Sequence, residues 1–343
     1  MGGPLMASQG IVVHYPARGA KPLPNVPASA YVLANARTGA VIAAKDAHGL
    51  YPPASTLKVL TAITMLPKLR PNAMVKASRL AVSVQPNVVG LVRGREYRVA
   101  DLFRALLLIS ANDAAVALTQ ASGSFAKGMA LINAEAHHLQ AYDVVAKVPN
   151  GLPRAGQVVS AYDLALIGRQ ALEMPSFMKY DSTLAAKFPL SNHKKTTLVN
   201  QNYLLTRYKG GIGGKIGWTS KAHATYIGMA RRHGVTLIVT IMHCTSLMEI
   251  VSAEKLLNWG FANMGRVKPV GTLVPPLRLA SHRGTSRLGG SHPLGAPASL
   301  AGAGAARSGA SGGTAIAAGV AALICIAMVG FVLIRRRLSA GKR

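Results

Sequence analysis

The sequence predicts an α+β fold, in which a mainly antiparallel sheet is made from both ends of one domain and covered by helices. Short apolar runs typical of strands lie near the start, at 31–34 and 40–44, and again near the end, at 224–231 and 235–243. The chain between them shows the apolar spacing of helices. Strands at both ends with helices between them favour a single sheet to which both ends contribute.

The elements follow in a regular order. Arg37, Thr38 and Gly39 separate the first two strands and indicate a hairpin. Helical patterns come next, at 55–69, 99–108, 113–121, 124–139 and 161–172. The last two strands are joined at 232–234, and a closing helix is expected at 249–261. We therefore predict one domain over 28–265, large enough to be a catalytic domain, preceded by an extended lead-in, 1–27.

The C-terminal part has a different composition. Residues 266–313 are rich in Gly, Ala, Ser, Pro and Arg and read as a flexible basic linker. Residues 314–334 carry no charge, and a helix of that length is roughly 30 Å long, the thickness of a bilayer's hydrocarbon core. A buried core helix is the alternative, but Arg335, Arg336 and Arg337 follow at once. We therefore expect a single transmembrane helix.

The basic tail, 335–343, sets the expected orientation. By the positive-inside rule this tail is cytoplasmic and the domain lies on the extracytoplasmic side of the cell membrane. The first residues show no basic region followed by an apolar stretch, the pattern of a signal peptide. Either a signal peptide is missing from this N-terminus, which we favour, or the C-terminal span alone directs insertion.

The charge and the cysteines exclude several classes of protein. The formal net charge is +28, which favours polyanionic surroundings. No zinc-finger or RNA-recognition signature is present, so anionic lipids or wall polymers are expected rather than nucleic acid. Cys244 and Cys325 lie in separate apolar segments and form no disulfide framework. No Cys or His spacing matches a metal site, so we expect neither metal nor cofactor.

Ser55 and Lys58 form the first candidate reactive pair. Pro52 and Pro53 precede a helical pattern, which places Ser55 in the first turn with Lys58 three residues on, on the same face. A serine hydroxyl is a weak nucleophile until a base takes its proton, and a lysine of lowered pKa can be that base. Alone, the spacing also fits a capped helix with a surface lysine.

Two further segments supply polar groups. Ser110 and Asn112 lie between two helical patterns, on a tight loop that can project a hydroxyl and an amide into a cleft; helix capping is the alternative for this loop, with Asp113 as N-cap. A glycine-dense stretch leads into a strand pattern in which Lys215, Gly217 and Thr219 share one face. That face offers an ammonium, open backbone and a hydroxyl to an anionic substrate.

The motifs S-x-x-K, S-x-N and K-x-G occur in the order of the serine penicillin-binding signature set. With YPPASTLKVLTA, LLLISANDAAVAL and KIGWTSKAHATYIGMA around them, the chain resembles the low-molecular-mass penicillin-binding family of serine-type D-alanyl-D-alanine carboxypeptidases over 28–264. The resemblance implies a β-lactamase/D,D-peptidase-like fold. It also implies peptidoglycan stem peptides as substrates and β-lactams as inhibitors.

The resemblance implies roles for the first two motifs. Ser55 would attack the bond between two terminal D-alanines and form an acyl-enzyme, with Lys58 as general base. Ser110 would relay the proton to the leaving amine. Asn112 would hold Lys58 and the substrate's amide.

It implies substrate-binding roles for the third motif. Lys215 would attract the terminal carboxylate, and Gly217 and Thr219 would lie along the substrate. The backbone N–H groups of Ser55 and Trp218 would form the oxyanion hole.

One residue departs from the family pattern. The middle of the third motif is usually Thr or Ser, and here it is Ile216. Losing one hydrogen bond to a charged group costs about 1.5–3 kcal/mol of binding, unless Thr219 substitutes. A related transpeptidase, endopeptidase or β-lactamase, and a catalytically weak wall-binding or scaffold protein, are therefore the alternatives to the carboxypeptidase.

Overall fold

The computed structural model describes residues 1–15, 19–190 and 194–278. They belong to one compact unit, Met1–Ser281. Within these ranges no helix is both long and apolar enough to cross a membrane. The predicted span at 314–334, the tail at 335–343 and most of the linker lie outside the described residues, so the fold prediction is tested for the domain alone.

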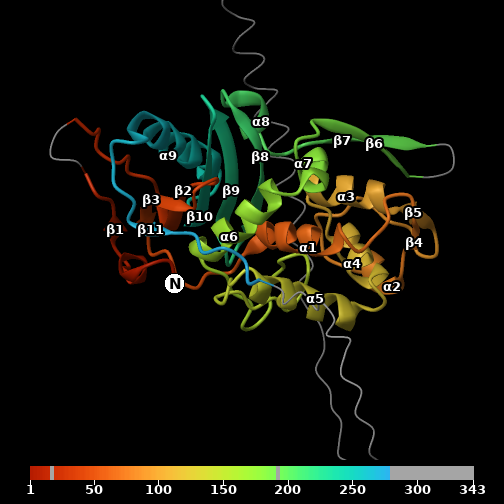
Figure 1. The fold of residues 1–343 in the computed structure, drawn as a ribbon. Helices are drawn as coiled ribbons and strands as arrows, with labels where there is room; N and C mark the ends of the chain where they lie inside the picture. Colours follow the sequence, from red (N-terminus) through yellow and green to blue (C-terminus); the bar gives the residue numbers. More distant parts are fainter. Residues whose placement is uncertain (16–18, 191–193, 279–343) are drawn as a thin grey trace, which may run out of the picture. The chain divides into compact units, whose positions relative to one another are not determined.

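A seven-stranded antiparallel sheet forms the centre of the described part (Figure 1). Its order is β1-β3-β2-β10-β9-β8, and β11 also pairs with β3. The strands are β1 (Ile11–Val12), β2 (Ala28–Asn35), β3 (Ala40–Lys45), β8 (Gly211–Thr219), β9 (His223–Arg232), β10 (Val235–Cys244) and β11 (Gly271–Thr272). Because β2 pairs with β10, the sheet joins both ends of the domain, as predicted.

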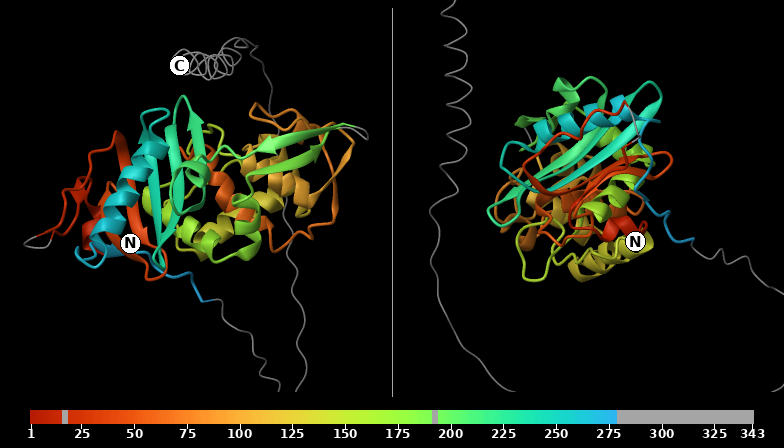
Figure 2. Two further views of the ribbon diagram at one scale, coloured as in Figure 1. Left: turned by 90° about the horizontal axis from the view of Figure 1, so that it is seen from above. Right: turned by 90° about the vertical axis from the view of Figure 1, so that its left-hand side faces the viewer.

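Helices cover both faces of the sheet. Gly260 in α9 (Glu249–Asn263) lies against Leu237, whereas Gly168 in α6 (Ala161–Leu172) lies against Ile238. Successive side chains of a strand point to opposite faces, so α9 and α6 pack on opposite sides of β10. The view from above shows α9 on one side of the central strands and the orange and yellow helices around α1 on the other side (Figure 2).

The helix α1 (Leu57–Met65) lies at the centre of the helical part and contacts α3, α4, α5 and α6. Every residue of α1 is buried, Lys58 included. The other helices are α2 (Arg79–Val82), α3 (Val99–Leu108), α4 (Asn112–Ala121), α5 (Phe125–His138), α7 (Pro175–Asp181) and α8 (Leu204–Arg207), with 3-10 turns η1 (Pro4–Ala7) and η2 (Ala54–Thr56). A helix that supplies a functional side chain is thus held on all sides.

Two small two-stranded sheets beside the helices were not predicted. They are β4 (Met74–Lys76) with β5 (Glu96–Arg98), and β6 (Ala185–Pro189) with β7 (Lys195–Val199). The predicted helix at 55–69 is also shorter than expected, since α1 ends at Met65 and Pro67 follows soon after. The three- to five-residue strands of these two sheets are too short to show a clear alternation of apolar and polar residues.

The predicted domain limits, 28–265, need correction. Met6 is buried, β1 pairs with β3, and β11 pairs with β3 from the other end of the domain. Residues from both the predicted lead-in and the start of the predicted linker therefore belong to the compact unit. Their strands contain two residues each, which is too short for a periodic signal in the sequence.

Candidate active site

Ser55 lies in the 3-10 turn η2, directly before α1. The turn is tied to the sheet because the carbonyl of Pro53 accepts hydrogen bonds from Thr56 Oγ1 at 2.6 Å and from Thr225 Oγ1 at 2.9 Å. The preceding residue, Ala54, has φ +47°, a conformation that costs energy for a residue with a side chain. The backbone before Ser55 is thus held in one strained shape.

Two glycines allow other segments to approach this turn. A Cβ at Gly217 in β8 would lie 2.7 Å from the backbone nitrogen of Ser55. A Cβ at Gly151, where φ is +77°, would collide with the carbonyl of Ala54. Only glycine fits such close approach, so β8 and the 147–157 loop confine the nucleophile turn.

The side-chain nitrogen of Lys58 contacts three groups at the bottom of the site. Its Nζ is 2.7 Å from Ser55 Oγ, 3.3 Å from Ser110 Oγ and 2.9 Å from the carbonyl oxygen of Asn150. The carbonyl can only accept a hydrogen bond. A neutral amine can therefore donate to Asn150 and Ser110 while its lone pair accepts the proton of the Ser55 hydroxyl.

Burial lowers the pKa of Lys58 well below its usual value. The positive charge of Lys215 lowers this pKa further, and the carboxylate of Asp113 opposes the effect. Desolvation disfavours the charged form of a lysine, so Lys58 is poised as a neutral base. This is the protonation state that can activate a serine hydroxyl.

The second motif contributes Ser110 to the site, but Asn112 does not contact Lys58. Ser110 has φ +62°, which aims its hydroxyl at Lys58. Asn112 Nδ2 donates to the carbonyl of Gln85 at 2.8 Å, and its buried Oδ1 has no partner among the described residues. The predicted contact of Asn112 with Lys58 is therefore absent, and the carbonyl of Asn150 is there instead.

Asp113 is not an N-cap, contrary to our sequence interpretation. It lies in the first turn of α4, and its carboxylate accepts the backbone N–H groups of Val89, Gly90 and Leu91 at 2.9–3.1 Å. It thereby fixes the loop before α3 to the loop that carries Ser110.

The third motif brings Lys215 to the site as a buried cation. Burial lowers the pKa of Lys215 to about 7, although Asp181 opposes this, and burial raises the pKa of Asp181. Asp181 accepts the backbone N–H of Gly214 at 2.6 Å. Lys215 Nζ donates to the carbonyl of Ile216 at 2.8 Å. Lys215 is thus hydrogen-bonded to its own strand, in the electrostatic field of a buried carboxyl group.

The other residues of β8 are divided between its two faces. Gly217 is buried against the Ser55 turn, whereas Ile216 packs against the apolar cluster on the α9 side of the sheet. Thr219 Oγ1 accepts the N–H of Ala222 at 3.0 Å. Trp218 is 50% exposed, and its Nε1 donates to Ser246 Oγ at 2.7 Å. Among the described residues, neither the Thr219 hydroxyl nor the Trp218 indole forms a hydrogen bond with Lys215.

Sequence reasoning missed Asn150 and Asp181. Asn150 acts through its carbonyl oxygen, which any residue would supply, so its side chain gives no signal of the contact. Asp181 lies at the end of a seven-residue helix, far in sequence from Lys215. The glycines at Gly151 and Gly213 were the available signals, because a Cβ at Gly151 would collide with the carbonyl of Ala54 and a Cβ at Gly213 would collide with the carboxylate of Asp181.

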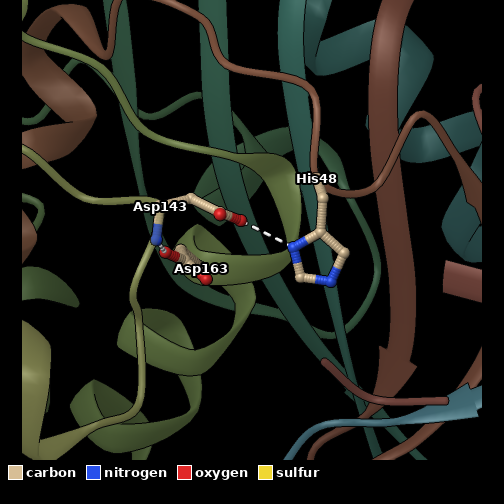
Figure 3. Close-up of side chains that lie close together, drawn as sticks. All are labelled: His48, Asp143 and Asp163. Carbon is tan, nitrogen blue, oxygen red and sulfur yellow. Dashed lines mark hydrogen bonds and ion pairs between the residues drawn. The ribbon is translucent and has the colours of Figure 1, made fainter. Parts of the chain in front are cut away.

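A separate group of titratable side chains lies between the β3–η2 loop and α6 (Figure 3). His48 Nδ1 is 2.6 Å from Asp143 Oδ2, and Asp163 accepts the backbone N–H of Asp143 at 2.7 Å. The hydrogen bond to Asp143 raises the pKa of His48, and burial raises the pKa of Asp163 to about 7. The ligand atoms lie within 4.8 Å of one another, but they pair with each other, and we assign no metal to them.

The pH dependence of acylation offers a test of the charge contact between Lys215 and Lys58. Acylation by penicillin should fall at low pH, where Lys58 gains a proton. Replacing Lys215 by Gln removes a positive charge that lowers the pKa of Lys58, so that pKa rises and the acidic limb moves to higher pH. The measurement is the labelling rate at a series of pH values.

The exposed Lys209 serves as control, because Lys209→Gln changes the net charge equally. Its acidic limb should match that of the wild type. If the acidic limb of the pH profile lies at the same pH in Lys215→Gln as in the wild type, a group other than Lys58 sets the pH dependence of acylation.

The fold and this arrangement of Ser55, Lys58 and Ser110 define a class: serine enzymes that transfer an acyl group with lysine in place of the histidine base. Comparisons with known proteins narrow the class. Residues 17–246 match the family model described as D-alanyl-D-alanine carboxypeptidase. The chain belongs to this family.

Similarity to individual proteins supports the same family. The chain is 37% identical to D-alanyl-D-alanine carboxypeptidase DacB2 of Mycobacterium tuberculosis over 252 residues, which covers 71% of this chain and 86% of the relative. A crystal structure of a D-alanyl-D-alanine carboxypeptidase from the same organism superposes with a TM-score of 0.70 at 36% identity, covering 75% of this chain and 99% of that one. The Streptomyces K15 DD-transpeptidase superposes with a TM-score of 0.66 at 26% identity, covering 71% and 100%. The predicted penicillin-binding family is thereby confirmed.

Proposed function

We propose that this protein is a serine D-alanyl-D-alanine carboxypeptidase that removes the terminal D-alanine of peptidoglycan stem peptides. The observation that carries the proposal is the 2.7 Å contact between Ser55 Oγ and the buried, depressed-pKa Nζ of Lys58. The test is release of D-alanine from a peptide ending in D-alanyl-D-alanine by residues 1–281, with mass-spectrometric location of a penicillin adduct. Absence of both signals from the folded protein would refute the proposal.

In the acylation step, the lone pair of Lys58 takes the proton of Ser55, and Oγ attacks the carbonyl carbon between the two D-alanines. The backbone N–H groups of Ser55 and Trp218 would hold the oxyanion, which is stabilised by preorganised donors. Ser110, 3.3 Å from Lys58 Nζ, would pass the proton to the leaving nitrogen. The C–N bond breaks, D-alanine leaves, and an ester on Ser55 remains.

In the second step, water replaces the leaving amine. Lys58 takes a proton from the water, the hydroxide attacks the ester carbon, and the proton returns to Ser55 Oγ as the C–O bond breaks. A β-lactam carbonyl would follow the first step with its ring nitrogen as leaving group. Since that nitrogen stays attached to the acyl group, a stable adduct would form, in keeping with the penicillin-binding family.

Lys215 would bind the terminal carboxylate of the substrate. It is a buried lysine that makes no hydrogen bond to Ser55 among the described residues, and its Nζ is held by the carbonyl of Ile216. The alternative of a non-catalytic wall-binding protein is not favoured, because the pair of Ser55 and Lys58 is intact. Ile216 therefore affects affinity rather than the chemistry.

Replacing Ile216 by Thr restores the hydroxyl usual for the family and should lower KM for a D-alanyl-D-alanine peptide by about ten-fold, with kcat little changed. Ile216→Val is the matched control, because Val has the shape of Thr without the hydroxyl. Equal KM values for the two variants would show that the new hydroxyl faces the α9 side, where Ile216 packs, and not the substrate.

We further propose that residues 314–334 anchor the chain in the cell membrane, with the domain on the extracytoplasmic side. The uncharged run and the following Arg335, Arg336 and Arg337 support this placement. Fractionation of the full chain and of a form ending at residue 281 tests it, because only the full chain should remain with the membranes after a high-salt wash.

A further inference from the structure

Two neighbouring cavities lie beside the Ser55 turn. The larger, of 470 Å³, is lined by Leu80, Val116 and Phe125 and by residues of the loop between Val148 and Arg154. The smaller, of 170 Å³, is lined by Pro52, Gln157 and Lys221. Pro153 and Arg154 line both cavities, so the two meet at these residues. We call the pair the Arg154 groove.

The Arg154 groove adjoins the reacting groups on two sides. Asn150, whose carbonyl accepts from Lys58, lines the larger cavity, and so does Gln85, whose carbonyl accepts from Asn112. Pro52, three residues before Ser55, lines the smaller cavity. The groove therefore begins beside the Ser55 turn, although Ser55 itself lines neither cavity.

The loop that carries Arg154 is built rigidly. Buried Gln157 accepts the N–H groups of Lys147 and Val148 at 3.0 Å and donates to the carbonyl of Leu152 at 2.8 Å. The N–H of Gln157 also donates to the carbonyl of Arg154 at 3.1 Å, which closes a turn in which Gly156 has φ +72°. The backbone of Arg154 is therefore fixed with respect to the Ser55 turn.

The groove is positively charged. Arg154 and Lys221 are exposed, and neither takes part in an ion pair among the residues that the structure describes. No Asp or Glu lines either cavity within the described ranges. Two uncompensated cations at the edge of an apolar groove attract an anionic ligand, and a guanidinium binds a carboxylate through two hydrogen bonds.

We propose that the Arg154 groove binds the acyl side of the substrate, and that Arg154, assisted by Lys221, binds a carboxylate on the residue that precedes D-alanyl-D-alanine. This inference rests on the proposed function, in which Lys215 holds the terminal carboxylate and leaves the groove for the rest of the peptide. The apolar wall of Leu80, Val116 and Phe125 takes the carbon chain that bears the carboxylate. The enzyme thereby selects stem peptides by the charge of their third residue.

The test uses two peptides that differ in one charge. One is N-acetyl-L-2-aminoadipyl-D-alanyl-D-alanine, and the other carries the side-chain amide. For the wild type, kcat/KM should be about ten-fold or more higher for the acid, mainly through KM. Arg154→Gln should bring the ratio close to one, and Lys221→Gln should lower it in part.

Arg37→Gln is the matched control, because Arg37 is exposed in the β2–β3 turn, at the end of the sheet away from Ser55. It should keep the wild-type ratio. A ratio of one in the wild type, or a ratio that Arg154→Gln leaves unchanged while both rates fall, would overturn the inference and make Arg154 a structural residue.

Failure of the proposed function would look different. If the wild type released no D-alanine from either peptide, the carboxypeptidase assignment would fail. The inference would then be tested by competition, with each peptide present while a fluorescent penicillin labels Ser55. The acid should reduce the labelling at about ten-fold lower concentration than the amide. Equal protection by the two peptides would overturn it.

Discussion

Ser55→Ala should abolish both covalent labelling by a fluorescent penicillin and release of D-alanine. The substitution removes the oxygen atom that forms the ester in the proposed mechanism. A loss of at least about 10³-fold in kcat is expected, as for other covalent serine enzymes. Labelling followed by gel electrophoresis and an assay for free D-alanine measure the two losses.

Structural damage is a poor explanation for such a loss. Ser55 Oγ contacts Lys58, but the turn is held by the backbone of Pro53, the hydroxyls of Thr56 and Thr225, and Gly217. The Tm of Ser55→Ala should therefore stay within a few degrees of the wild type. Persistent labelling of this variant would show that another side chain is the nucleophile.

Removing the base should have the second largest effect. In Lys58→Ala none of the described residues remains within hydrogen-bond distance to take the Ser55 proton, and labelling should fall by about 10³-fold or more. Lys58→Ala also leaves a cavity in a fully buried helix, so its stability must be measured in parallel. The labelling rate of the fraction that is folded is the quantity to compare.

Lys58→Met separates the two effects. Methionine fills most of the space of lysine without an amine, so its core packing is retained. The variant no longer buries an amine, which stabilises the fold, but the carbonyl of Asn150 loses its hydrogen-bond donor, which destabilises it. Because the two effects oppose each other, Tm should change little. Labelling near the wild-type rate in Lys58→Met would eliminate Lys58 as the base.

Much of the domain could be predicted from local patterns. The helices at 99–108 and 161–172 were predicted at their observed bounds, and the two pairs of central strands within a few residues. These elements have long apolar repeats, and Ser124 and Ser160 cap the helices that follow them. The strands at β1 and β11 could not be predicted, because their stability comes from pairing with β3 and not from their own two residues.

The residues of the site were also only partly predictable from the sequence. Side chains that act through their own chemistry, Ser55, Lys58, Ser110 and Lys215, could be placed from motif and spacing. The role of Asn150 could not, because it depends on a backbone atom brought in by Gly151. The hydrogen bond of Asn112 Nδ2 to the carbonyl of Gln85 could not be predicted either, because Gln85 lies in a loop without periodic pattern.

The two glycines beside the nucleophile turn have a consequence for how the protein can be used. Gly151 and Gly217 come from segments that are distant in sequence from Ser55, so the turn reaches its reactive shape only when three remote parts of the chain have met. A partly assembled chain has the serine but not the geometry. A covalent penicillin therefore counts correctly folded molecules one by one, and it would report misfolding in a mixed population that absorbance or mass cannot separate.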